Sequence, residues 1–246
     1  AWATFIAEWF ALLMGLVICF ALSQNFPKII WTLIFSRTKI ITILSVNRDI
    51  FLRSLMVEMI FVSFLMTSGK FGDVELAATQ ILLQFLHISS YGMDGFAFAA
   101  EVLVGQAVGK SNRFMLRDAV IKSGLWTFVI AICLALIYAL FGSFFIKIMT
   151  TSDEVILASE AFLIFIVLGP IFGALPFLMD GIFVGATRSI DMRNMMFLSL
   201  IIYVVSAYVL IDLYGFYGLW LALLVSYAAR GISLVMRYPK LEKSIS

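Results

Sequence analysis

Long apolar stretches fill most of the chain, and short polar segments separate them. About 20 apolar residues in a helix are enough to cross the hydrocarbon core of a bilayer, which is about 30 Å thick. The pattern predicts seven membrane-spanning helices, at residues 1–23, 50–68, 76–108, 118–146, 155–186, 194–212 and 215–236. We therefore expect an all-α membrane protein, a polytopic helical bundle with seven transmembrane helices.

The composition agrees with a membrane location. Apolar residues make up 63% of the chain and charged residues 13%, and the mean hydropathy is +1.08. Soluble domains contain roughly 45–50% apolar residues, so this chain has too little polar surface to cover a water-soluble globule. The lipid bilayer is thus an expected partner, and the formal net charge of +2 gives no indication of nucleic-acid binding.

Basic residues mark one side of the predicted bundle. Of the 17 lysines and arginines, all except Lys70 and Lys147 lie in or near the connections on the same side as the end of the chain. Cytoplasmic loops of membrane proteins carry an excess of Lys and Arg. The distribution predicts an external N-terminus and a cytoplasmic C-terminus.

The connection between the first two spans, residues 24–49, is longer than the others. Its apolar residues are interrupted by Arg37 and Lys39, and Trp31 is placed to lie at the level of the lipid headgroups. This pattern is typical of an amphipathic helix on the cytoplasmic surface. We interpret the segment as a linker between two halves of a larger protein.

The third span carries a row of polar and aromatic residues along an otherwise apolar helix. They recur at alternating steps of four and three, which places them on one helix face. The row consists of Gln80, Gln84, His87, Tyr91, Asp94, Phe98 and Glu101. We expect Gln84, His87, Tyr91 and Glu101 to line a substrate cavity. A hydrogen-bonded helix–helix contact is the alternative for His87 and for the glutamines.

Acidic residues lie within the spans, whereas the sequence places the basic residues at span ends or in loops. The acids in question are Glu8, Glu58, Asp94, Glu101 and Asp180. An ionised carboxylate facing lipid at the bilayer centre costs at least about 2.5–3.5 kcal/mol, so these groups should face a protein interior or a wet cavity. Without basic partners they must bind a proton, a metal cation or a cationic substrate. Glu58, Asp94 and Asp180 are therefore the candidate coupling residues.

Two sites carry residues that weaken a helix. Pro170 and Pro176 lie in the fifth span and each removes a backbone donor, while Gly92 and Gly95 flank Asp94 in the third. Irregular helices are tolerated within membranes where they line a cavity. We expect these four residues to act as hinges, with a static kink as the alternative.

Three stretches resemble the multidrug and toxic compound extrusion (MATE) family. They are "ELAATQILLQFLHI" at 75–88, "LVGQAVGKSNRFMLRDAV" at 103–120 and "DGIFVGATRSIDMRN" at 180–194, the last resembling the branch of DNA-damage-inducible F-like (DinF-like) proteins. The resemblance covers most of residues 50–240. It implies the C-terminal half of a twelve-helix transporter with two six-helix lobes.

The resemblance also implies a domain division and some residue roles. Residues 1–23 would be the last helix of the N-lobe, 24–49 the inter-lobe linker, 50–238 the C-terminal lobe and 239–246 a cytoplasmic tail. By position, Glu58 matches a glutamate that sodium-coupled members use, and the resemblance thus implies Na⁺ at Glu58 as one option. Asp180 falls about one turn from their second acidic residue. The aspartate on which DinF-like members rely is in span one, in the N-lobe.

The resulting functional hypothesis is a secondary active efflux antiporter of the bacterial inner membrane, not an enzyme. It would export amphipathic or cationic organic compounds, including drugs, in exchange for H⁺ or Na⁺, with no other cofactor and with the N-terminal lobe as partner. The alternatives are a seven-helix receptor, another polytopic membrane protein, or an intramembrane aspartyl protease using Asp94 and Asp180. A retinal protein is excluded because no lysine lies between Lys147 and Lys240.

Overall fold

The computed structural model describes residues 2–22 and 36–245, and the backbone of these residues is almost entirely α-helical. The helices are α1 (Trp2–Leu22), α3 (Arg37–Ser68), α4 (Asp73–Gly109), α5 (Arg113–Met149), α6 (Asp153–Ala161), α7 (Leu163–Gly185), α8 (Ser189–Tyr214) and α9 (Phe216–Lys243). The chain divides into two compact units, residues 1–44 and 45–246. The all-α prediction is confirmed.

Six described helices are long and apolar enough to cross a membrane: α1, α3, α5, α7, α8 and α9. The remaining long helix, α4, carries the polar row and is not among these six. The predicted fifth span is divided at Phe162, which separates the short α6 from α7. The break therefore precedes the two prolines, and both Pro170 and Pro176 lie inside an uninterrupted α7.

Helices α3 and α9 extend at one end well beyond the predicted spans. Helix α3 begins at Arg37, so the described part of the predicted surface linker is the first part of the helix that crosses the membrane. The rest of that prediction, including Trp31, lies outside the described residues. Helix α9 continues to Lys243, seven residues past its expected end. This extension places Arg230 well inside a helix.

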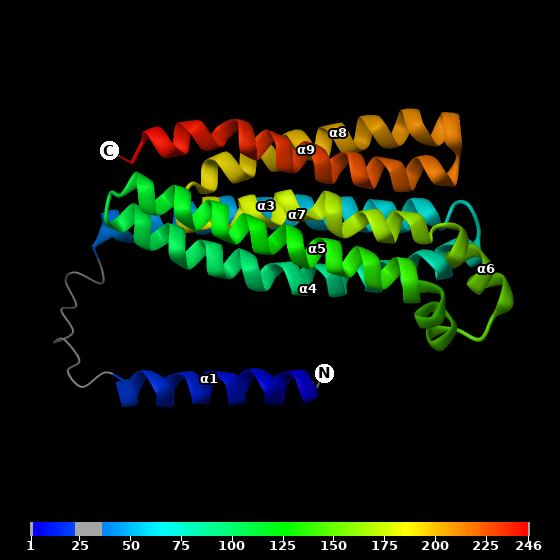
Figure 1. Ribbon diagram of the computed structural model, residues 1–246, viewed down its shortest axis with the longest axis horizontal. Coiled ribbons are helices and arrows are strands. Elements are labelled where there is room, and N and C mark those ends of the chain that lie inside the picture. Colours follow the sequence, from blue (N-terminus) through cyan, green and yellow to red (C-terminus); the bar gives the residue numbers. More distant parts are fainter. Residues whose placement is uncertain (1, 23–35, 246) are drawn as a thin grey trace. The chain divides into compact units, whose positions relative to one another are not determined.

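In the second unit, the long helices run side by side and α7 packs against α4, α5 and α9 (Figure 1). Glycines allow the close approach of α4 and α7. A Cβ on Gly181 would collide with the backbone of Ala97, and one on Gly185 would collide with the backbone of Glu101. Small residues four positions apart are a common device for close packing of membrane helices.

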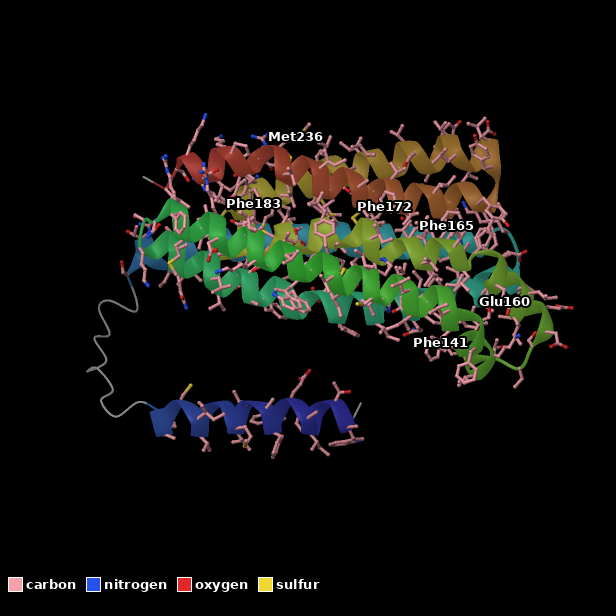
Figure 2. The ribbon with its side chains drawn as sticks, in the orientation of Figure 1. Phe141, Glu160, Phe165, Phe172, Phe183 and Met236 are labelled. Carbon is pink, nitrogen blue, oxygen red and sulfur yellow. The ribbon has the colours of Figure 1, made fainter. Side chains whose placement is uncertain are left out.

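Apolar side chains both fill and cover the second unit. Phe165 and Phe183 are buried, while Phe141 and Met236 project outward, as Figure 2 shows. Near one end of α3, Phe64 packs edge-on against Trp220 with ring centroids 4.9 Å apart. An apolar outer surface over a packed interior is expected of a bundle that lies in lipid.

The first unit contains α1. No residue in the most apolar stretch of this helix is buried. The side chains of Trp2–Ala21 are exposed, including Trp2, Phe10 and Phe20. A helix that is apolar on all sides is stable when lipid or other helices surround it.

Candidate functional site: a carboxylate-lined cavity

A cavity of about 380 Å³ lies among α3, α4, α7 and α9 of the second unit. Its titratable or charged lining residues are Arg53, Glu58, His87, Asp94, Glu101, Asp180, Tyr227 and Arg230. Aromatic side chains complete the wall, and the His87 ring lies beside Phe61 with centroids 6.1 Å apart. The cavity therefore combines apolar surface with four carboxylates and two guanidinium groups.

Asp180 is held by two arginines. Arg53 Nη1 on α3 donates to Asp180 Oδ2 at 2.6 Å, and Arg230 Nη2 on α9 donates to the same oxygen. The prediction that the intramembrane acids lack basic partners is wrong for Asp180. Sequence position placed both arginines near span ends, but Arg230 is only 8% exposed and forms part of the cavity wall.

This ion-paired group joins three helices and leaves two polar atoms unused. Asp180 Oδ1 and Arg53 Nε are buried and have no hydrogen-bond partner among the described residues. A buried polar atom without a partner costs free energy comparable to a lost hydrogen bond. A water molecule or a polar ligand in the adjoining cavity would remove this cost.

The other three carboxylates of the cavity are different. Within the described parts of the chain, Glu58, Asp94 and Glu101 form no ion pair and no side-chain hydrogen bond. Asp94 is close enough to Asp180 and the two arginines to interact with them electrostatically. The two guanidinium groups on Asp180 carry one positive charge more than that carboxylate, but with the other three carboxylates the cavity has four acidic groups against two basic ones.

Helix α4 supplies one wall of the cavity, from His87 to Glu101, about 21 Å along the helix axis. Of the four predicted lining residues, the structure places His87 and Glu101 in the wall. Gln84 and Tyr91 are not among the lining residues, and Tyr91 is 76% exposed.

Helix geometry explains the difference. Each residue turns the helix by about 100°, so Asp94 lies within about 20° of His87, whereas Tyr91 and Gln84 are rotated by about 40° and 60° in the opposite direction. The predicted row is thus broader than the cavity, and its far edge turns away from α3 and α7. The sequence rule missed Ser90 and Ala97, which lie on the near edge and line the cavity.

None of the four predicted hinge residues is among the residues that line the cavity. Gly92 has room for a side chain in ordinary contact with Leu134, and nothing lies within 4 Å of a Cβ at Gly95. Pro170 and Pro176 are buried within α7. Each proline removes the amide that would bond to the carbonyl four residues earlier, which weakens α7 locally.

Two chemical alternatives can be compared with this geometry. An aspartyl dyad needs two carboxyl groups that share a proton, but Asp180 is occupied by two arginines, which does not match that arrangement. In the residues that the structure describes, no three His, Cys, Asp or Glu side chains converge as a metal site. Glu58 is therefore part of no such group in this part of the chain.

Comparison with known proteins gives consistent matches. The MatE family model matches residues 50–209. The chain is 33% identical over 240 residues to the DNA damage-inducible protein F of Escherichia coli (strain K12), covering 95% of this chain and 51% of that protein. The chain therefore spans about half the length of the curated relative it matches.

Solved structures show the same fold. The bent form of the Vibrio cholerae MATE transporter VcmN superposes with a TM-score of 0.76 at 17% identity, covering 86% of this chain and 49% of that one. The eukaryotic MATE transporter AtDTX14 gives a TM-score of 0.69 at 18% identity, covering 77% of this chain and 45% of that one. From the family match, the identity and the fold together, the chain belongs to the MATE family of membrane transporters, and it is similar to the DinF-like branch.

Proposed function

We propose that this chain forms one lobe of a secondary active efflux antiporter, which exports amphipathic organic cations in exchange for H⁺ or Na⁺. The observation that carries the proposal is the excess of carboxylates over basic groups in the cavity, four against two. A cavity that is both apolar and negatively charged favours a ligand with an apolar body and a positive charge.

The exchange would take place on the carboxylates that have no basic partner. Low-dielectric surroundings disfavour an ionised carboxyl group, so such a group binds either a proton or a cation. If the coupling ion and the substrate compete for Asp94, each lowers the affinity for the other, as thermodynamic linkage requires. Glu58 and Glu101 lie along the same cavity and would extend the binding surface.

Aromatic side chains would contribute to binding of the substrate. Phe61, Phe98 and Phe177 line the cavity. The face of an aromatic ring attracts a cation by about 0.5–2 kcal/mol, depending on how far the cation is desolvated. Such contacts are tolerant of substrate shape, which fits a transporter with a broad range of substrates.

The test is transport by the full-length protein in proteoliposomes. An imposed gradient of H⁺ or Na⁺ should drive movement of a fluorescent organic cation. Asp94→Asn and Glu58→Gln should weaken the dependence on that gradient. Asp153→Asn and Glu154→Gln make the same chemical changes in the exposed first turn of α6, outside the cavity, and should leave coupling intact. Full coupling in both cavity variants would overturn the proposed role of these carboxylates.

A further inference from the structure

A second recess lies on the opposite side of α3 from the cavity, between α3 and α8. Its volume is about 320 Å³ and it shares no lining residue with the cavity described above. Leu52, Leu55, Met56 and Phe197 form an apolar groove, and Arg193 with Asn194 lie at one end of it. The apolar part and the polar part are thus separated along the groove.

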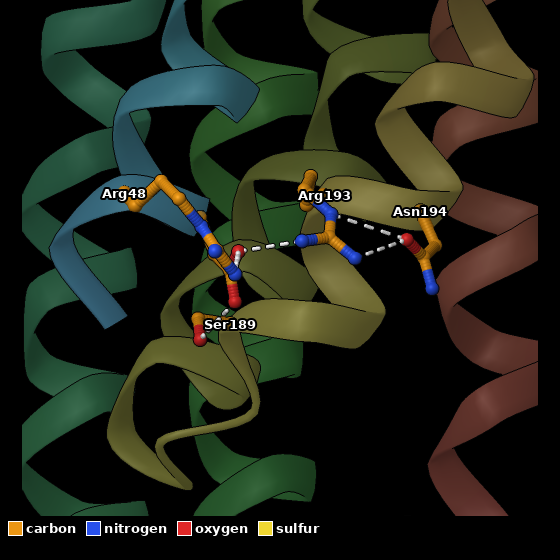
Figure 3. A network of polar contacts seen from close by, with 5 residues as sticks. Arg48, Ser189, Arg193 and Asn194 are labelled. Atoms are coloured by element: carbon orange, nitrogen blue, oxygen red, sulfur yellow. Dashed lines mark hydrogen bonds and ion pairs between the residues drawn. The ribbon is translucent and has the colours of Figure 1, made fainter. Parts of the chain in front are cut away.

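The polar end is built around a buried carboxylate. Asp49 is 2% exposed and accepts hydrogen bonds from Arg193 Nη1 at 2.6 Å, Arg48 Nη2 at 3.2 Å and Ser189 Oγ at 3.3 Å. Figure 3 shows the two arginines reaching this group from different sides. One carboxylate between two guanidinium groups leaves an excess of positive charge at the end of the groove.

Donor groups remain available at this end. Arg193 uses three of its five N–H groups, one on Asp49 and two on Asn194 Oδ1 at 3.2 and 3.0 Å. The Arg48 side chain is 64% exposed and that of Arg193 is 28% exposed. The network therefore fixes both cations in place while keeping them accessible to an anion.

The depth of these residues matches the edge of a bilayer. Arg48 and Arg193 lie at the end of the bundle where the basic residues gather, and the apolar groove begins one turn further along each helix. From Arg193 to Phe197 the axial rise is about 6 Å. The headgroup region of a bilayer adds about 5–7 Å on each side of the hydrocarbon core, so the two lengths are similar. Basic pockets between membrane helices on the cytoplasmic side bind anionic lipid headgroups.

We infer that the groove between α3 and α8 binds an anionic phospholipid, with its phosphate on Arg48 and Arg193 and one acyl chain along Leu52, Met56 and Phe197. The charge at the polar end selects the headgroup, and the apolar groove holds the chain. Because Asp49 bridges the start of the α3 span to the start of α8, a bound lipid would stabilise that junction. The site is independent of the proposed transport activity.

The experiment measures lipid retention by the full-length protein. The protein is purified from vesicles containing equal amounts of phosphatidylglycerol and phosphatidylcholine, and the retained lipids are counted by native mass spectrometry. A cation near the membrane surface favours anionic lipid by about fivefold, so retention of phosphatidylglycerol should exceed that of phosphatidylcholine by about this factor.

Two variants separate the parts of the site. Arg48→Gln removes an exposed charge and should abolish most of the selectivity. Leu55→Trp fills the groove without touching the Asp49 network and should reduce retention of both lipids. The control is Val205→Trp in another apolar groove on α8, which has no charged lining residue, and it should leave the selectivity unchanged.

Two results would overturn the inference. One is equal retention of both lipids by the unaltered protein. The other is unchanged selectivity in Arg48→Gln together with unchanged retention of both lipids in Leu55→Trp. A third result would also overturn it: the unaltered protein shows no lipid preference, and Leu55→Trp destabilises the full-length protein. In that case another segment of the transporter, and not a lipid, would occupy the groove.

Discussion

Asp94 and Asp180 are two carboxylates in one cavity, on helices that pack closely together, and their surroundings differ. Asp180 accepts from Arg53 and Arg230 and so ties α7 to α3 and α9. Asp94 forms no ion pair within the described residues and faces the cavity. Depth in the membrane alone therefore does not identify a coupling residue, because a deep acid can be neutralised permanently by the protein.

We propose a structural role for Asp180 and a ligand-binding role for Asp94. A carboxylate that two guanidinium groups hold cannot release them without leaving positive charges buried. A carboxylate without such partners can exchange one mobile cation for another at much lower cost. The two residues should consequently respond differently to neutralisation. Neutralising Asp180 should lower the stability of the protein, and neutralising Asp94 should impair its function.

The largest effect is expected from Asp180→Asn. The change leaves Arg53 and Arg230 without a counter-charge in the cavity wall, and breaking a buried pair in this way costs about 3 kcal/mol or more. Thermal unfolding of the full-length protein in detergent measures the loss. A variant as stable as the unaltered protein would contradict the structural role of Asp180.

A smaller loss is expected from Gly181→Leu, which tests the packing next to this ion-paired group. The new side chain would collide with the backbone of Ala97 on α4, and overpacking of this kind costs about 1–3 kcal/mol. The same unfolding assay measures the effect. Unchanged stability would mean that α4 and α7 are not held as closely as described.

A gain in stability is expected from Gly95→Ala, on the same helix as Asp94. No atom lies within 4 Å of the added Cβ, and replacing glycine in a helix by alanine is worth about 0.5–1 kcal/mol. Transport assays on this variant test the predicted hinge separately. A loss of stability would contradict the finding that the added Cβ has free space around it. An unchanged transport rate would mean that Gly95 is not a hinge.

The sequence was a good guide to the helices and a partial guide to the cavity. Apolar length alone located the spans, because crossing a bilayer requires a minimum number of residues whatever the fold. The helix period placed His87, Asp94 and Glu101 on one face, and the structure brings these three into one wall. Tyr91 failed because the four-residue step from His87 rotates it by about 40°, away from the side on which Asp94 lies.

The partners of Asp180 could not be obtained from the same reasoning. Pattern along one helix gives approximate depth, but the rotation of a helix and its neighbours depend on contacts between distant segments. Arg230 lies 50 positions from Asp180 and Arg53 lies 127 positions from it. One signal was present: "YAARGIS" surrounds Arg230 with small residues inside a long apolar pattern, which is unusual for a residue at a membrane surface.

The smallest change in stability is expected from Asp94→Asn. The side chain has no ion-pair partner to lose, so the free energy of unfolding should change by no more than about 0.5 kcal/mol. Asp153→Asn provides the matched control at an exposed position. A loss as large as that of Asp180→Asn would show that Asp94 also has a structural role, and the contrast between the two acids would fail.

The most direct test measures binding of an organic cation to the full-length protein over a series of pH values and Na⁺ concentrations. In the unaltered protein, the affinity for the cation should fall as H⁺ or Na⁺ rises, because the ions compete for Asp94. In Asp94→Asn this dependence should weaken by about tenfold, within the usual range of coupling between ligands. The same dependence in Asp94→Asn as in the unaltered protein would contradict the claim that the unpaired carboxylate exchanges the ions.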